Sequence, residues 1–415
     1  MKASTLYLMA ALAGAANTVN ARRPFARSGP LSVGSFASGW VTSEAVVPVI
    51  AAQACLTGVF AARGAFKRPA GWLGLGITAA SWAALITEQR RSEAAGQVLE
   101  HGLTEGLGDN YRSEISDEEA PLGVLDKYVP GVGSRSNLFA TDIAYGDAGA
   151  RNLLDIWRSP NLSTDAKAPV LVQVHGGGWI IGNKREQARP LMSLMADHGW
   201  VCVSINYRLS PRATWPDHIV DVKRAIAWVK DNIADFGGDP DFVAITGGSA
   251  GGHLSSLAAL TPNEAMFQPG FEDADTSVVA AVPFYGVYDF LNRDGTGRDD
   301  MLEMLEDRVF KSKRDVETEV WEKASTMTWV REDAPPFFVI HGSNDSLVPV
   351  EQARSFVETL SAKSSSPVIF VELPGAQHAF DIFRSARTSH TIRAVARFLE
   401  TVRKRAGHGS VSHAA

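Results

Sequence analysis

The sequence predicts an α/β fold, a mostly parallel sheet flanked by helices, over residues 141–405. The main observation is that short apolar runs alternate with segments of helical period, which is typical of a parallel sheet. A second observation is that Gly-rich turns directly follow two of the apolar runs. The predicted strands are Leu153–Trp157, Val170–Val174, Val201–Ile205, Phe242–Ile245, Val278–Phe284, Phe337–His341 and Val368–Leu373. The predicted helices are Ala188–His198, Pro216–Phe236, His253–Leu260, Val350–Ser361 and Thr388–Arg405.

Length and composition exclude some classes of protein. The 415 residues could form two domains, or one large domain with additions, and the formal charge of −6 argues against a nucleic-acid partner. Cys55 and Cys202 each lie in an apolar run, so a disulfide framework is not expected. No group of side chains has metal-ligand spacing, and we expect neither a metal nor a cofactor. The sequence leaves the oligomeric state open.

Residues 1–91 form a hydrophobic segment. Ala45–Ala62 and Pro69–Thr87 are uncharged and each is about long enough to cross a bilayer, so we expect a membrane-integral helical hairpin. The alternative is a pair of soluble core helices. Thr5–Ala16 is either a signal-peptide core, with a weak cleavage site at 19–21, or a first membrane helix. Basic residues occur on both flanks of the hairpin and do not decide its orientation.

Two further segments interrupt the pattern. Residues 92–140 are acidic and Gly-containing, and predict a linker with one short helix, Ser92–Leu103. Residues 287–334 are too long for a plain crossover and carry apolar side chains at helical spacing. We expect a lid over the carboxyl ends of the strands, with a substrate-contacting face formed by Met301, Leu302, Met304 and Leu305; ordinary packing helices are the alternative. Residues 406–415 predict a mobile tail.

Ser249 lies at the centre of Gly-x-Ser-x-Gly, between an apolar strand and a helix. A strand that turns at once into a helix forces the central residue into a strained conformation, and its neighbours must be small. The turn exposes the hydroxyl at a helix N-terminus, which favours negative charge. We therefore predict a nucleophile, with a simple Gly-rich turn or a phosphate cradle as the alternatives.

A second Gly-rich loop, His175-Gly176-Gly177-Gly178-Trp179, directly follows a predicted strand. Three glycines let backbone N–H groups approach a reacting oxygen without side-chain collision. We predict an oxyanion hole formed by the N–H groups of Gly176, Gly177 and Ala250, with Trp179 contacting the substrate. A phosphate-binding loop is the alternative, but the Lys-Ser/Thr ending of that motif is missing.

A serine nucleophile needs a base, and the base needs a carboxylate to orient it. Asp345 lies just past a predicted strand, and His378 lies in the loop after the last strand. Their order in the chain, Ser then Asp then His, is that of the α/β-hydrolases. His253 lies one helical turn beyond the serine, and His175 and His341 are next to strand ends, so these compete less well as the base.

These motifs resemble the hormone-sensitive-lipase-like branch of serine esterases, over about Tyr145–Leu399. The resemblance includes Asn206–Pro211 and Gly238-Asp239-Pro240. It implies an α/β-hydrolase fold, with Ser249, Asp345 and His378 as the triad. One departure is that the residue before the serine, usually Asp or Thr, is Gly248 here. The N-terminal hydrophobic segment is similar, more loosely, to that of microsomal deacetylases and isoprenylcysteine methylesterases.

The sequence thus predicts a membrane-anchored carboxylic ester hydrolase that acts through an acyl-enzyme. An apolar lid and a membrane anchor favour lipophilic esters of short or medium acyl chain. The alternatives are a serine peptidase, amidase or deacetylase on the same fold. A catalytically silent receptor for a small ligand is a further alternative, although such receptors typically lack the base.

Overall fold

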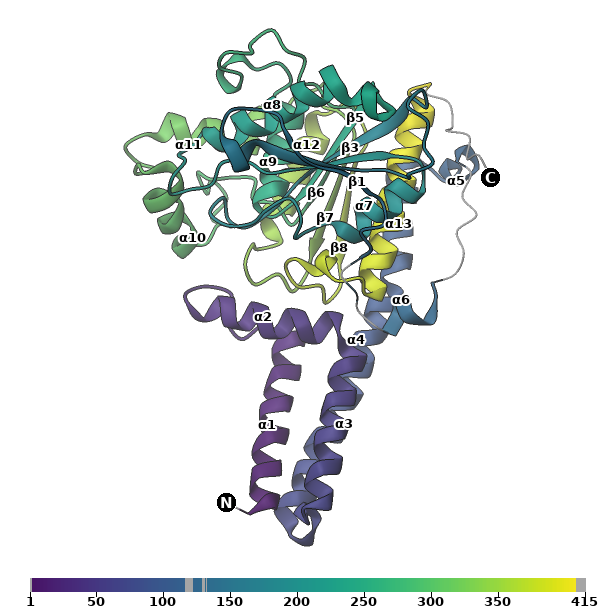
Figure 1. Ribbon diagram of the computed structural model, residues 1–415. Helices are drawn as coiled ribbons and strands as arrows, with labels where there is room; N and C mark the ends of the chain where they lie inside the picture. Colours follow the sequence, from purple (N-terminus) through teal and green to yellow (C-terminus); the bar gives the residue numbers. More distant parts are fainter. Residues whose placement is uncertain (1, 116–121, 129–130, 132, 408–415) are drawn as a thin grey trace.

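The computed structural model describes residues 2–115, 122–128, 131 and 133–407 of the chain. The acidic residues 117–119 and most of the tail predicted at 406–415 lie outside the described residues. The described part has two bodies, a three-helix stem and a sheet flanked by helices (Figure 1). The described residues begin in the stem and end in a helix that packs on the sheet.

The sheet has eight strands in the order β1-β2-β4-β3-β5-β6-β7-β8. β1 and β2 pair antiparallel to each other and β2 pairs antiparallel to β4, while all later pairs are parallel. All seven predicted strands are present, but β1 was missed and begins three residues before Thr141. The bounds are β1 Leu138–Ala144, β2 Leu153–Trp157, β3 Ala168–Val174, β4 Val201–Ile205, β5 Gly238–Gly248, β6 Ala280–Phe284, β7 Phe337–Gly342 and β8 Val368–Leu373.

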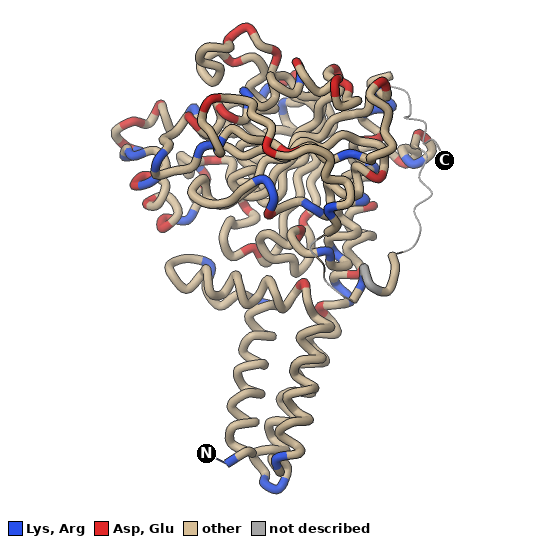
Figure 2. Tube along the Cα trace, viewed as in Figure 1, with Lys and Arg blue, Asp and Glu red and all other residues tan. Residues whose placement is uncertain are grey.

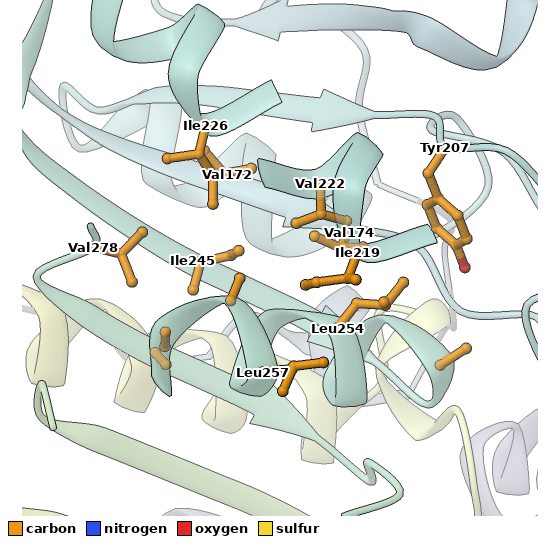
Figure 3. Packing of buried hydrophobic residues seen from close by; sticks show 14 of the residues in the cluster. Val172, Val174, Tyr207, Ile219, Val222, Ile226, Ile245, Leu254, Leu257 and Val278 are labelled. Carbon is orange, nitrogen blue, oxygen red and sulfur yellow. The ribbon is translucent and has the colours of Figure 1, made fainter. Parts of the chain in front are cut away.

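The two faces of the sheet bury alternate side chains of the same strands, as the pleat requires. Val172, Val174 and Ile245 meet α8 and α9 on one face (Figure 3), whereas Leu171 and Ala244 belong to the core on the opposite face. The helices of the first face are α8 Asp217–Asn232, α9 Ala250–Leu260 and α12 Glu351–Lys363. Those of the opposite face are α7 Arg189–Asp197, α13 Ala386–Arg405 and the second half of α4. Both faces are therefore covered, as expected for an α/β fold.

The stem consists of α1 Ala3–Arg22, α3 Val46–Ala62 and the first half of α4 Pro69–Leu107. Of the 17 residues of α3 only Val46 is buried. Lysine and arginine lie at both ends of the stem but not along it (Figure 2). Among the described residues, α4 is the one helix long and apolar enough to cross a membrane, and α2 with α3 would also qualify if counted as one bent span.

The helix predicted at Ser92–Leu103 is not a separate element, because α4 runs without a break from Pro69 to Leu107. Its second half buries Ala95, Leu99 and Leu103 against the sheet and α13. The composition changes near Thr87 because the helix leaves the stem there and begins to cover the sheet. The predicted boundary between residues 91 and 92 therefore falls inside one helix. Two short helices follow, α5 Tyr111–Glu114 and α6 Val124–Tyr128.

The helix α2, Leu31–Glu44, was not predicted and lies between the stem and the sheet (Figure 1). It meets α3 at an angle of 94° across a single residue, Ala45. This segment contains two glycines and four serines, which have low helix propensity, so its composition did not indicate a helix. The insertion at 287–334 contains the helices expected there, α10 Asp299–Met304 and α11 Thr318–Ala324, with a π-helical turn at Leu305–Phe310.

One buried charge joins these parts. Arg387, at the start of α13, is fully buried and pairs with Glu44 of α2 and, at 3.1 Å, with Glu88 of α4. Its backbone N–H also donates to the Ser92 hydroxyl at 3.0 Å. A buried cation without a partner is costly, so the stem and α2 contribute to the stability of the sheet domain.

We predict that a chain beginning at Ser92 is less stable than the full chain by several kcal/mol. It lacks both carboxylates that neutralise Arg387, and removing the partner of a buried charge costs about 3–5 kcal/mol. Urea unfolding in detergent, followed by circular dichroism, measures the difference. In the shortened chain Arg387→Met should recover part of the loss, because it removes the unpaired cation. Equal stability of the shortened chain and its R387M variant would contradict the prediction.

Candidate active site

Ser249 lies at the turn between β5 and α9, with φ 59° and ψ −120°. This positive φ is rare for a residue with a side chain and marks local strain. The turn is possible because glycines surround it: a Cβ on Gly251 would lie 2.1 Å from the Val174 carbonyl oxygen. Ser249 is partly exposed although the residues on either side are buried. The serine is thus held clear of the sheet, as predicted.

Asp345 follows β7 and is buried. Its Oδ1 accepts the N–H groups of Leu347 and Val348, both at 2.8 Å. Its Oδ2 lies 2.6 Å from His378 Nδ1 and 3.2 Å from His341 Nε2. Burial alone would raise the pKa of Asp345, but the charge of His378 and the histidine hydrogen bonds outweigh it, so the pKa is well below its ordinary value. The carboxylate is therefore ionised at neutral pH.

His378 lies in the loop after β8, next to Ala379, which has φ 57°. Since ionised Asp345 can only accept, the His378 Nδ1 carries the proton of this hydrogen bond. In the neutral ring the Nε2 atom then has a lone pair, as a general base requires. The strands β5, β7 and β8 are parallel members of one sheet, so Ser249, Asp345 and His378 all follow strand ends at the same edge.

Tyr285 fills the space between the serine turn and His378. Its ring lies 4.5 Å from the His378 ring, and its buried hydroxyl donates to Asp381. A Cβ at Gly248 would be only 2.7 Å from that hydroxyl oxygen. This explains the departure from the family pattern: a side chain before the serine would collide with Tyr285. The sequence contained no signal for the pair Tyr285 and Asp381, which lie 96 residues apart.

The loop at 175–179 approaches the serine from β3. A Cβ at Gly176 would lie 3.1 Å from Ser249 Cβ. However, the Gly176 N–H donates to Gln187 Oε1 at 2.7 Å, so this predicted oxyanion donor is already used. Gly177 and Gly178, with φ 120° and 60°, continue the loop in conformations suited to glycine. His175 beneath the loop is buried, and burial lowers its pKa to about 4.

Trp179 and the four predicted lid residues are mostly buried. Trp179 is 2% exposed, and its Nε1 donates to His253 Nδ1 at 3.3 Å. Leu302 and Leu305 belong to the main hydrophobic core, and Met301 and Met304 pack against that core. Substrate contact by these five residues stays a prediction.

The helix α2, which lies outside the sheet domain, also contributes a side chain that packs on His378. The Phe36 ring meets the His378 ring edge-on at 5.9 Å. Trp40 stacks on Phe383 at 4.5 Å, and its Nε1 donates to the Ala379 carbonyl at 2.9 Å. The spacing of Phe36 and Trp40, four apart in an uncharged stretch, was the one sequence signal that could have indicated this helix.

The fold agrees with the comparisons with known proteins. Residues 154–360 match the family model BD-FAE. The chain is 49% identical to the probable carboxylic ester hydrolase LipM of Mycobacterium tuberculosis, over 95% of this chain and 93% of that protein. It is 43% identical to the esterase LipQ of the same organism, over 94% and 89% of the two chains. A thermophilic esterase from Thermogutta terrifontis superposes with a TM-score of 0.55 at 24% identity, covering 64% of this chain and 94% of that one.

The sheet order and the position of Ser249 at its turn define an α/β-hydrolase. The chain belongs to the hormone-sensitive-lipase-like family of serine esterases within that fold, together with the mycobacterial esterases to which it is similar over nearly its whole length. The family predicted from the motifs is therefore confirmed, while the roles of Ser249, Asp345 and His378 stay predictions.

We predict that His253 makes the fold less stable in mild acid. Its Nε2 donates to the Ala324 carbonyl at 2.8 Å and its Nδ1 accepts from Trp179, so only the neutral ring fits. Burial lowers the pKa of His253 to about 4, whereas the unfolded value is about 6.5. The unfolded chain thus binds the proton first, and stability falls as the pH drops from 6.5 towards 4, by about 2 kcal/mol at pH 5.

Denaturant unfolding at pH 7 and pH 5 measures this change in the full chain and in His253→Asn. The variant should lose less stability between the two pH values than the wild type. His101→Gln is the matched control, because the His101 side chain is 74% exposed and should not affect the slope. An unchanged slope in H253N would show that this ring does not control the acid response.

Proposed function

We propose that this chain is a membrane-anchored serine carboxylesterase in which Ser249, His378 and Asp345 form the triad. The observation that supports it best is the 2.6 Å contact between His378 Nδ1 and ionised Asp345, at the sheet edge where Ser249 is held in a strained turn. The esterase names of relatives that are 43–49% identical support the same reaction.

In the proposed reaction the Ser249 oxygen attacks the ester carbonyl carbon while His378 Nε2 takes the hydroxyl proton. Asp345 stabilises the resulting imidazolium ion. The N–H groups of Gly177 and Ala250 stabilise the tetrahedral oxyanion, and Gly178 replaces Gly176, whose N–H is used by Gln187. The alcohol leaves with the proton from His378. Water then attacks the acyl-enzyme, and His378 serves as base again.

A fluorophosphonate probe should label Ser249 and no other serine, and Ser249→Ala should leave a folded protein without measurable turnover of short esters. Asp345→Asn should lower turnover by about 10⁴-fold, because the base is no longer held in the correct tautomer. Steady-state assays on a panel of ester and amide substrates, with mass spectrometry of the labelled peptide, test all three statements. A label on another serine, or near-normal turnover in D345N, would refute the proposed triad.

We further propose that the stem crosses a membrane through α1, α3 and the first half of α4. α1 has 20 residues and α3 has 17, which corresponds to about 30 Å and 25 Å of helix and is close to the thickness of the hydrocarbon layer. Tyr7 of α1 hydrogen-bonds Thr57 of α3 and Thr78 of α4 at 3.0 and 3.3 Å. Hydrogen bonds of this kind join helices inside a bilayer and favour α1 as a retained helix over a cleaved signal peptide.

The full chain should therefore stay with the membrane fraction after washing with high salt and with alkaline carbonate. Salt screens charge but does not reverse apolar insertion. Immunoblotting of pellet and supernatant measures the distribution, with a loosely bound peripheral protein as the control that is released. Release of the full chain by carbonate would show that the stem is a soluble bundle.

A further inference from the structure

α2 has one face directed at the active site. Phe36 contacts the His378 ring, and Trp40 binds the carbonyl of the next residue, Ala379. At its other end, Ser32 accepts a hydrogen bond from Arg298 at 2.9 Å, and Arg298 also binds the Ser346 carbonyl, next to the triad acid. This inner face is thus fixed to both loops that carry the acid and the base.

The opposite face of α2 is uncharged, carries two large apolar side chains and has nothing covering it in the described structure. At 100° per residue, Leu31 and Val41 each lie about 140° around the helix from Phe36. Leu31 is 78% exposed and Val41 43%. Residues 28–43 contain no charge. Isolated exposed apolar residues need no explanation, but an uncharged helix with two on the side away from Phe36 does.

This outer face continues the apolar surface of the stem. Eight residues lie between α1 and α2, and one residue lies between α2 and α3. In the connection from α1, Phe25 is exposed between the exposed side chains of Arg23 and Arg27. Exposed aromatic and basic residues next to an apolar helix favour the head-group region of an anionic bilayer. The helix also lies across the stem (Figure 1), as an interfacial helix would.

We propose that the outer face of α2 lies on the surface of an anionic phospholipid bilayer and that α2 forms the membrane-side wall of the active site. His378 is then separated from the lipid by about one helix diameter, roughly 10 Å. Ester substrates with a lipophilic chain enter from the lipid layer beside Phe36, which contacts the chain. The lipid contact is independent of the reaction, whereas substrate entry past Phe36 rests on the proposed esterase function.

Fluorescence quenching in vesicles tests the lipid contact. Two variants of the full chain, each with one introduced cysteine, are made in a Cys55→Ser background, Leu31→Cys and the control Val316→Cys, and each is labelled with the fluorophore NBD. Val316 is a matched control because it is 77% exposed and lies on the sheet domain. In phosphatidylcholine–phosphatidylglycerol vesicles, head-group and shallow nitroxide lipids should quench the L31C label at least threefold more than the V316C label.

Equal quenching at both positions would overturn the lipid contact. Self-quenching of the L31C label that disappears when labelled protein is diluted with unlabelled protein would instead show a second copy on this face, and would also overturn it. Neither readout depends on catalysis. Labelling of Ser249 by a fluorophosphonate in the same vesicles reports separately on the proposed function.

Chain-length preference tests entry past Phe36. Phe36→Ala should lower the ratio of kcat/KM for octanoyl to acetyl esters about tenfold, because a longer chain loses apolar contact that an acetyl group does not make. Phe36→Leu keeps an apolar side chain and should recover most of the ratio. An equal decrease for both esters would show that Phe36 only positions His378, and would overturn its role in substrate entry.

Discussion

The relation of the stem to the active site depends on the buried charge of Arg387. Its guanidinium lies between carboxylates of α2 and α4, and its Nη2 lies 3.5 Å from the Pro374 carbonyl in the segment that leads to His378. A cation buried to this degree cannot stay unpaired. The three elements therefore have to stay together, and the position of α2 against His378 follows from their pairing.

The position of the nucleophile depends on a different constraint, the backbone conformation of the turn at Ser249. The turn at Ser249 needs Gly251 because the Val174 carbonyl passes so close, and it needs Gly248 because of Tyr285. Tyr285 itself has a positive φ of 37° and is held by Asp381. Strained residues persist where their surroundings leave no alternative. Here the surroundings are β6, which pairs with β5 and ends directly before Tyr285, and the loop that carries His378. Tyr285 therefore links the position of the serine turn to that of His378.

Local patterns predicted seven of the eight strands, the serine turn and the two loops with Asp345 and His378, because each depends on residues adjacent in sequence. Two features could not be found this way. The continuity of α4 was hidden because its environment changes from stem to sheet near Thr87, so its apolar pattern changes although the helix does not end. Arg387 pairs with Glu88, which is 299 positions away in the sequence, and with Glu44, which is 343 positions away. No local sequence pattern indicates contacts over such separations.

Two elements lie near the active site and are candidates to cover it, the insertion at 287–334 and α2. The insertion at 287–334 matched the expected helices, but Leu302 and Leu305 are part of the core and cannot move without exposing it. α2 is also held in place, by the aromatic contact of Phe36 with His378, by the hydrogen bond from Arg298 to Ser32 and by the buried pair of Glu44 with Arg387. It differs from the insertion because its outer face is free of sheet contacts. In the proposed entry route, a substrate chain therefore passes beside Phe36 while α2 stays in place.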